Sequence, residues 1–291
     1  IANIRQKLID DLDIDNFNNK NQLPEALDLI TARTEFYEQP AALPTVESSS
    51  IKMDLHRRDF TINTLALRLD GEYYGTIYDY WGGLADLQKG HIRVLHALSF
   101  VDDATRLLRA VRFEQRFNFV IEPRTLALME ESLPLLNRLT GARIRHEINL
   151  ILAEPKAPAM LARLDELGIL QAIHPALTWD DALDPYFASL DINAIDPVWD
   201  LPPHTDHLDL RQTLSYLIWL GSLPEHTLRS ITSRLRFKSD LKKMLLATSV
   251  LLKEMPGLVD AQPSEVVGTL DKAPRIAIYA VYLVTKDKNL R

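Results

Sequence analysis

Four arginines recur at helical spacing in the segment FVDDATRLLRAVRFEQRFNF (100–119). Arg106, Arg109, Arg112 and Arg116 follow one another at intervals of three, three and four residues. At ~100° per residue they share one face of a helix, about 120° wide. A row of guanidinium groups suits phosphates, because each presents paired donors that match phosphate oxygens. The residues expected on the opposite, inward face are Leu107, Leu108 and Val111.

Two carboxylates precede the first of these arginines by about one turn. Asp102 and Asp103 would lie within salt-bridge reach of Arg106 along a helix. A carboxylate and a guanidinium on one face can also read the Watson–Crick edge of a base, since the carboxylate accepts from an exocyclic amine while arginine donates to the ring. A solvated helix face with intrahelical ion pairs would show the same spacing, so the pattern alone leaves both interpretations open.

A second polar group lies in DLHRRDFTINTLAL (54–67). If this segment is helical, Asp59 and Asn63 share a face at four-residue spacing, with Arg58 beside them. One carboxylate, one amide and one guanidinium could hold a ribose hydroxyl and a phosphate. The alternative is an amphipathic segment with a structural ion pair.

Other polar motifs favour structural roles. In DYWGGLADLQKGHIR (79–93), Gly82 and Gly83 predict a tight turn that Asp86 can cap, and we interpret the segment as a connector. Asp13 and Asp15 form a DxD, a pattern that can hold Mg²⁺, but no glycine-rich loop precedes it. The motif HTDHLD (204–209) could ligate a metal, and its proline-rich setting favours a surface loop.

Composition limits the class of protein. The chain has 291 residues, of which 46% are hydrophobic and 25% charged, and a formal charge of −7. These values are ordinary for a globular protein and exclude general attraction to nucleic acid. The absence of cysteine excludes disulfides and thiol catalysis. No apolar run approaches the ~20 residues of a membrane span, so we expect a cytoplasmic protein without a membrane partner.

The hydrophobic pattern changes near residue 96. Before it, alternation and β-prone composition predict strands, a proline- and serine-rich loop over 39–50, and an apolar helical or strand-like segment over 51–69. The expected strands cover 25–34, 72–80 and 91–95. After it, the apolar spacing is helical, with start signals at Ser99, Glu122 and Thr140 and a stop at Gly168. The expected helices cover 101–117, 123–136, 141–152 and 158–167.

These segments together resemble the family of class II tRNA nucleotidyltransferases and poly(A) polymerases. HRRDFTIN (56–63) is similar to its RRDFTxN motif, and the segment 79–93 is similar to its DPxxGxxDLxxxxIR motif. FVDDATRLLRAVRF (100–113) resembles EDxxRxLRAxRF, and GARIRHEI (141–148) resembles ERIxxE. The resemblance covers roughly residues 23–175, with four motifs in the family's order.

The resemblance implies an α+β fold, with a partial nucleotidyltransferase palm of small mixed β-sheet followed by a mainly helical neck and body. The implied domains are a head over 1–95, a nucleotide-binding neck over 96–155 and an RNA-binding body over 156–291. The implied reaction adds CMP or AMP, from CTP or ATP with Mg²⁺, to the 3′ end of tRNA. By the same resemblance, Asp103 and Arg106 pair with the incoming base. The further nucleotide contacts are Arg58, Asp59, Asn63, Arg109 and Arg112.

The chain also departs from the family pattern. No GGxVRD motif with a well-placed DxD precedes residue 23, so we expect a fragment without the main metal ligands, in which Asp28 could be a remaining palm carboxylate. Ala142 and Tyr80 replace a usual Glu and a usual Pro. Three activities stay open at this point: CCA, CC or A addition, polyadenylation of another RNA, and non-catalytic binding of RNA or nucleotide.

The distribution of charge agrees with a confined RNA contact. Residues 104–145 hold eight arginines and no lysine against four glutamates, which is a local charge of +4 on an acidic chain. A short basic face suits a nucleotide and one RNA end better than a long duplex.

Overall fold

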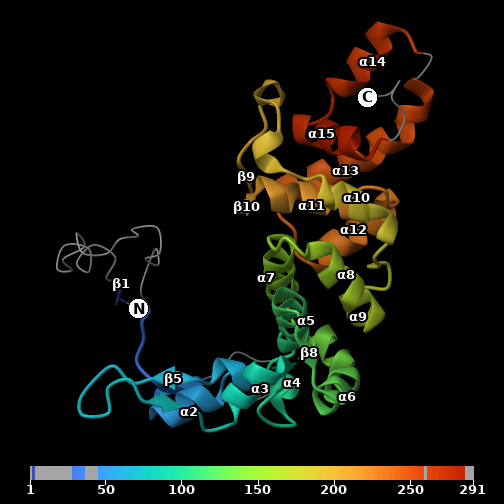
Figure 1. The fold of residues 1–291 in the computed structure, drawn as a ribbon. Helices are drawn as coiled ribbons and strands as arrows, with labels where there is room; N and C mark the ends of the chain where they lie inside the picture. Colours follow the sequence, from blue (N-terminus) through green and yellow to red (C-terminus); the bar gives the residue numbers. More distant parts are fainter. Residues whose placement is uncertain (1, 4–27, 37–44, 259–260, 286–291) are drawn as a thin grey trace, which may run out of the picture.

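The computed structural model describes residues 2–3, 28–36, 45–258 and 261–285. The ribbon has the outline of an L, with short strands and helices in the lower arm and stacked helices in the upright arm (Figure 1). We name the described residues up to 95 the head segment, residues 96–155 the neck helices and residues from 156 onward the body helices. These names follow the division predicted above. The predicted α+β class is confirmed.

The head segment consists of short strand pairs and short helices. The pairs β1–β2, β3–β4 and β5–β6 are antiparallel, whereas β7 pairs in parallel with β8 of the neck. The elements are β1 (Ala2–Asn3), β2 (Asp28–Leu29), β3 (Arg33–Phe36), β4 (Thr45–Ser48), α2 (Ile51–His56), the 3-10 turn η3 (Thr61–Asn63), β5 (Ala66–Leu67), β6 (Ile77–Tyr78), α3 (Gly83–Lys89) and β7 (His91–Ile92).

The neck and body are helical. The neck elements are α4 (Ser99–Asp102), α5 (Arg106–Phe117), β8 (Val120–Ile121), α6 (Pro123–Ser132), η4 (Leu133–Arg138) and α7 (Gly141–Leu152). The body elements are α8 (Ala157–Glu166), α9 (Ile169–Ile173), η5 (Asp181–Leu183), α10 (Asp184–Ala188), η6 (Ile192–Ala194), η7 (Pro197–Trp199), β9 (His204–Thr205), β10 (Leu208–Asp209), α11 (Leu210–Leu220), α12 (Glu225–Arg234), α13 (Ser239–Glu254), η8 (Met255–Leu258), α14 (Pro263–Leu270) and α15 (Arg275–Val284). No helix of the described part is long and apolar enough to cross a membrane.

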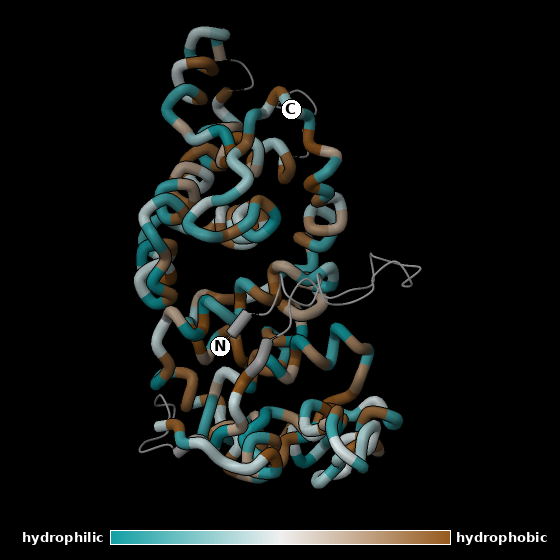
Figure 2. The backbone as a smooth tube through the Cα atoms, turned by 90° about the vertical axis from the view of Figure 1, so that its left-hand side faces the viewer, coloured by the Kyte–Doolittle hydropathy of each residue, from teal (hydrophilic) through white to brown (hydrophobic). Residues whose placement is uncertain are grey.

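One hydrophobic cluster joins the three parts. It runs from Phe60 in the head to Ala280 in α15, and hydrophobic stretches of the chain occur at every level of the molecule (Figure 2). The inward face predicted for α5 is confirmed, since Leu107, Leu108 and Val111 are completely buried. Because the core is continuous, α5 is held rigidly while its opposite face stays polar.

Two predictions near the head–neck junction, one of a helix and one of a connector, differ from the structure. The single helix expected over 101–117 is interrupted, because Asp103 is extended (φ −144°, ψ 100°) and its carboxylate accepts from the backbone and hydroxyl of Thr105. Such a local side-chain bond competes with helix formation. The connector expected over 79–93 contains helix α3, whose N-terminus is capped by Asp79, with Oδ1 and Oδ2 accepting from the amides of residues 83 and 84.

Of the other predicted element boundaries, some are confirmed and some are wrong. The loop expected over 39–50 contains the strand β4, whose four residues are all exposed. This strand is held by its pairing with β3 and buries no apolar face. The helix over 141–152 is confirmed, with Thr140 as its cap, and Gly168 (φ 71°) follows α8 as expected. The helix expected over 123–136 ends at Ser132, and the 3-10 turn η4, which has Pro134 in its first turn, follows from Leu133.

The neck and body are interlocked at the start of α7. Gly141 lies so close to the end of α12 that a Cβ would come within 1.9 Å of the carbonyl oxygen of Arg234. The guanidinium of Arg234 donates to the carbonyls of Leu136 and Leu139 at 2.8 and 3.1 Å. In the opposite direction, Nη1 of Arg145 in α7 donates hydrogen bonds to the carbonyls of residues 235 and 236. Only glycine permits this approach of two backbones.

We expect Gly141→Ala to destabilise the fold by about 1–3 kcal/mol, because the added methyl must displace backbone and not a flexible side chain. Chemical denaturation of the wild type and the variant measures the difference. Gly268→Ala in α14 is the matched control, since no described atom lies within 4 Å of its Cβ. Equal stability of the two alanine variants would contradict the interlock.

Candidate nucleotide-binding site

The arginine face of α5 meets the head segment through Arg109. Its Nε and Nη2 lie 2.7 and 2.5 Å from Oδ2 of Asp59. Oδ1 of Asp59 accepts from Nδ2 of Asn63 at 2.8 Å and from the amide of Phe60 at 3.0 Å. Asp59 and Asn63 therefore meet as predicted, although they do not share an α-helix: Asn63 lies in the 3-10 turn η3, and Asp59 precedes that turn.

The environment of Asp59 favours its ionised form. Burial by itself would raise the pKa of Asp59, but the charge of Arg109 and the hydrogen bonds from Asn63 and Arg109 hold that pKa below its ordinary value. Only 8% of the Asp59 side chain is exposed. The carboxylate therefore joins head to neck, and the amide oxygen of Asn63, which has no partner among the described residues, can accept from a ligand hydroxyl.

A second carboxylate, Glu147 of α7, lies behind Arg109. Its Oε1 is 3.8 Å from Nη1 of Arg109, and its Oε2 is 3.4 Å from Nη1 of Arg112. Burial raises the pKa of Glu147 despite these two cations. Among the described residues, Nε of Arg112 and Oε2 of Glu147 are buried without a hydrogen-bond partner. Arg112 is thus an internal counter-charge and not part of a solvated face.

Arg106 is buried and its guanidinium is bonded within the protein, and its pairing with the incoming base stays a prediction. Only 6% of the residue is exposed. Its Nη1 donates to Oγ of Ser99 at 2.6 Å, and its Nη2 donates to the carbonyl of Arg57 at 2.7 Å. Ser99 is the first residue of α4, as the start signal predicted, and its hydroxyl accepts from Arg106. The guanidinium ties α5 to α4 and to the head.

Asp103 lies at the open end of the same cluster. The expected bonds from Asp102 and Asp103 to Arg106 do not form, because the helix breaks between them. Asp103 instead pairs with Arg143 of α7 at 2.8 Å, and 23% of its side chain is exposed. Asp102 lies 3.7 Å from Nε2 of His96. The amide of Arg106 donates to the carbonyl of Asp103 at 3.1 Å, but the two side chains bond to different partners, and the Asp103 carboxylate stays partly exposed.

Arg58 lies at the outer edge of the site. Its Nη2 is 3.0 Å from Oδ2 of Asp54, and 45% of its side chain is exposed. Asp54 also accepts from Arg57 at 2.7 Å. A half-exposed guanidinium that is oriented from one side can still bind a phosphate from the other.

The remaining candidates lie outside this site. Asp13 and Asp15 fall outside the described residues, and so does the side chain of Asp28, whose backbone pairs with Asn3 in β2. The HTDHLD segment is the β9–β10 hairpin, in which Asp206 accepts from the amide of Leu241. Across the described part of the chain, no three His, Asp or Glu residues are grouped so as to hold a metal.

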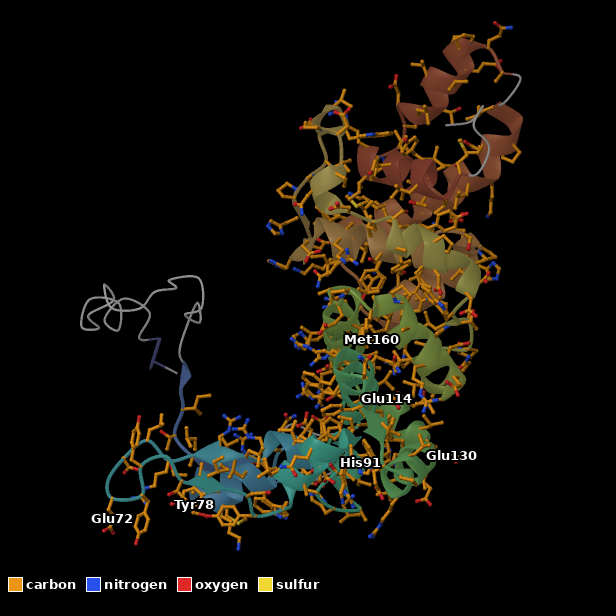
Figure 3. The ribbon with its side chains drawn as sticks, in the orientation of Figure 1. Glu72, Tyr78, His91, Glu114, Glu130 and Met160 are labelled. Atoms are coloured by element: carbon orange, nitrogen blue, oxygen red, sulfur yellow. The ribbon has the colours of Figure 1, made fainter. Side chains whose placement is uncertain are left out.

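Sequence reasoning gave no role to three residues that complete the site. Glu147 and Arg143 lie in GARIRHEI, and Asp54 opens DLHRRDF. Each belongs to a segment that was singled out, but its partner is distant in the chain or on another element. The signal was the excess of arginine over lysine, which predicts fixed bidentate partners. On the other side of α5, Glu114 pairs with Arg163 of α8 at 3.1 Å. Figure 3 labels Glu114 in the neck.

Comparison with known proteins finds similarity to nucleotidyltransferases and poly(A) polymerases. The family described as "Poly A polymerase head domain" matches residues 5–93, and the family described as "Probable RNA and SrmB-binding site of polymerase A" matches residues 118–180. A protein of Geobacter sulfurreducens named A-adding tRNA nucleotidyltransferase is 51% identical over 153 residues, which are 52% of this chain and 17% of that protein. The chain is thus similar, over its head and neck, to members of the tRNA nucleotidyltransferase and poly(A) polymerase family.

Other members of this family are similar as well. The CC-adding tRNA nucleotidyltransferase of Deinococcus radiodurans is 38% identical over 54% of this chain and 41% of its own length. A solved structure of a CCA-adding enzyme without ligand matches with a TM-score of 0.75 at 32% identity, over 91% of this chain and 62% of that one. Solved complexes of a CCA-adding enzyme with ATP and with CTP match with TM-scores of 0.67 and 0.66, both at 29% identity, over 82% of this chain and 58% and 57% of theirs. The chain therefore spans less than two thirds of each of these family members.

We expect Asp59→Asn to destabilise the fold by about 1–3 kcal/mol at neutral pH, because the amide places a donor against Arg109. Since the folded-state pKa of Asp59 is lowered, its contribution is complete above its unfolded value of about 4 and is lost as the pH falls through the folded-state pKa. Thermal melts of both proteins at a series of pH values measure this.

The control for this variant is Asp70→Asn, because the side chain of Asp70 is 78% exposed. We expect its stability to follow that of the wild type at every pH. A difference between wild type and Asp59→Asn that stays constant down to low pH would show that the charge of Asp59 does not stabilise the junction.

Proposed function

We propose that the chain supplies the nucleotide-reading part of a template-independent nucleotidyltransferase, which adds CMP or AMP to the 3′ end of tRNA. The observation that carries the proposal is the polar cluster between head and neck, where Asp103, Asn63 and Arg58 keep accessible polar atoms on a rigid frame. The names of family members similar to this chain, A-adding and CC-adding tRNA nucleotidyltransferase, indicate the substrates.

Each accessible group suits one part of a nucleoside triphosphate. Asp103 can accept from the exocyclic amine of adenine or cytosine, Asn63 from a ribose hydroxyl, and Arg58 can bind a phosphate. Arg109 and Arg112 hold the frame through Asp59 and Glu147, and they add positive potential beside the triphosphate. We assign Arg106 the role that its contacts favour, which is fixing the carbonyl of Arg57 next to Arg58.

The proposed reaction is an in-line displacement. The 3′ oxygen of the RNA forms a bond to the α-phosphorus of CTP or ATP, while the bond from that phosphorus to the β-phosphate oxygen breaks. The 3′ hydroxyl loses its proton and pyrophosphate leaves. Mg²⁺ enters this proposal through the family resemblance, which gives the metal the role of activating the attacking oxygen and stabilising the leaving group. The described residues do not form a site that fits the metal, so no step is assigned to it here.

A second candidate follows from that observation. Because the part of the chain described by the structure holds no metal-binding group of carboxylates and histidines, this chain could bind a nucleotide or an RNA end without catalysis. The two candidates differ in whether product forms, whereas both require nucleotide binding.

Incorporation of labelled CTP or ATP into tRNA that lacks its 3′ end tests the proposal. Two proteins are compared, this chain and a longer protein that contains it, and we expect Mg²⁺-dependent addition of one to three nucleotides that is abolished by a chelator. An unrelated RNA replaces tRNA as the acceptor control, and long homopolymer products on it would indicate polyadenylation. Nucleotide binding without product in both proteins would favour the non-catalytic candidate.

A further inference from the structure

The two oxygens of Asp103 have different surroundings. Oδ1 accepts three hydrogen bonds, from the amide of Thr105 at 2.9 Å, from Oγ1 of Thr105 at 2.7 Å and from Nη2 of Arg143 at 2.8 Å. Oδ2 has no hydrogen-bond partner among the residues that the structure describes. One oxygen is therefore fully used to hold the carboxylate, while the other stays available at a partly exposed position.

The holding bonds come from two directions. Thr105 lies two residues along the chain, in the break between α4 and α5, and forms a local turn around the carboxylate. Arg143 comes from the first turn of α7, 40 residues away, and crosses the open end of the cluster. Two supports from separate elements restrict rotation of the carboxylate more than either does alone, and this fixes the direction in which Oδ2 points.

We propose that Thr105 and Arg143 are positioning residues that orient Asp103 for base recognition. This inference rests on the proposed function. Held by Oδ1, the carboxylate presents Oδ2 as a single acceptor, which suits the exocyclic amine of adenine or cytosine and repels the keto oxygen of guanine or uracil at the same position. Without the supports the carboxylate rotates, and the preference for an amine weakens although Asp103 is still present.

A merely structural role for Arg143 predicts something else. Loss of the Arg143 side chain would then lower the melting temperature and weaken the binding of all nucleotides by the same factor. The informative quantity is therefore a ratio, namely the affinity for ATP divided by the affinity for purine riboside triphosphate, which lacks the 6-amino group. Loss of stability alone does not change this ratio, whereas misorientation of Asp103 does.

The experiment measures equilibrium binding of both nucleotides to the full chain, for the wild type and for Arg143→Ala, Arg143→Lys and Thr105→Val. We expect the wild type to prefer ATP by roughly tenfold, which is the size of one hydrogen bond to a charged group. The preference falls to within about twofold in Arg143→Ala, and it falls part of the way in Thr105→Val, which loses one of the three bonds. Arg143→Lys restores part of it, because an ammonium can reach the same oxygen from one side.

Arg145→Ala is the matched control. Arg145 lies on the same helix but donates to the carbonyls of residues 235 and 236, so its loss should lower the melting temperature and leave the ATP preference at the wild-type value. If the wild type prefers ATP, and if Arg143→Ala and Thr105→Val keep the same preference as the wild type, the inference fails and the proposed function stands. If the wild type binds neither nucleotide, or binds both equally well, the proposed base recognition fails and this inference with it.

Discussion

The structure depends on the ion pair between Arg109 and Asp59. It joins α5 of the neck to Asp59 of the head, which directly follows Arg57 and Arg58, and both oxygens of the carboxylate are bonded. Because Asp59 is almost fully buried, its charge must be compensated at close range, which only a fixed guanidinium does here. The pair therefore sets how α5 lies against the head, and the position of every other polar group at the junction follows from it.

Helix α5 has one face in the apolar core and another face at the polar junction with the head. Its apolar face is completely buried in a core that continues into the body, so the helix cannot turn to relieve unfavourable charges on its other side. That polar face is compensated by carboxylates from outside the helix, namely Asp59 from the head and Glu147 from α7. Burial raises the pKa of Glu147, whereas Arg109 and Asn63 outweigh burial and lower the pKa of Asp59, so the two carboxylates are stabilised to different degrees in their ionised forms. The ionised carboxylate is favoured more at Asp59, the contact with the head, which lies next to the position proposed for the nucleotide.

Local signals predicted much of this from the sequence, and long-range partners account for the rest. The helical spacing of the arginines, the inward leucines and the bounds of α7 were predictable, because they depend on periodicity and on a cap at Thr140. The burial of Arg106 was not, since a polar face has the same pattern whether water or a carbonyl of the head covers it. The break at Asp103 was missed because helix propensity does not include a side chain that bonds Thr105. The partner role of Glu147 needed the fold itself.

A double-mutant cycle on Asp59→Ala and Arg109→Ala, followed by chemical denaturation, tests most directly whether this ion pair holds the junction. If the two groups stabilise the fold through each other, the double variant is more stable than the sum of the single effects predicts, with a coupling energy of about 1 kcal/mol or more. Effects that add to within roughly 0.3–0.5 kcal/mol would contradict the account, because they would show that α5 is held against the head by other contacts.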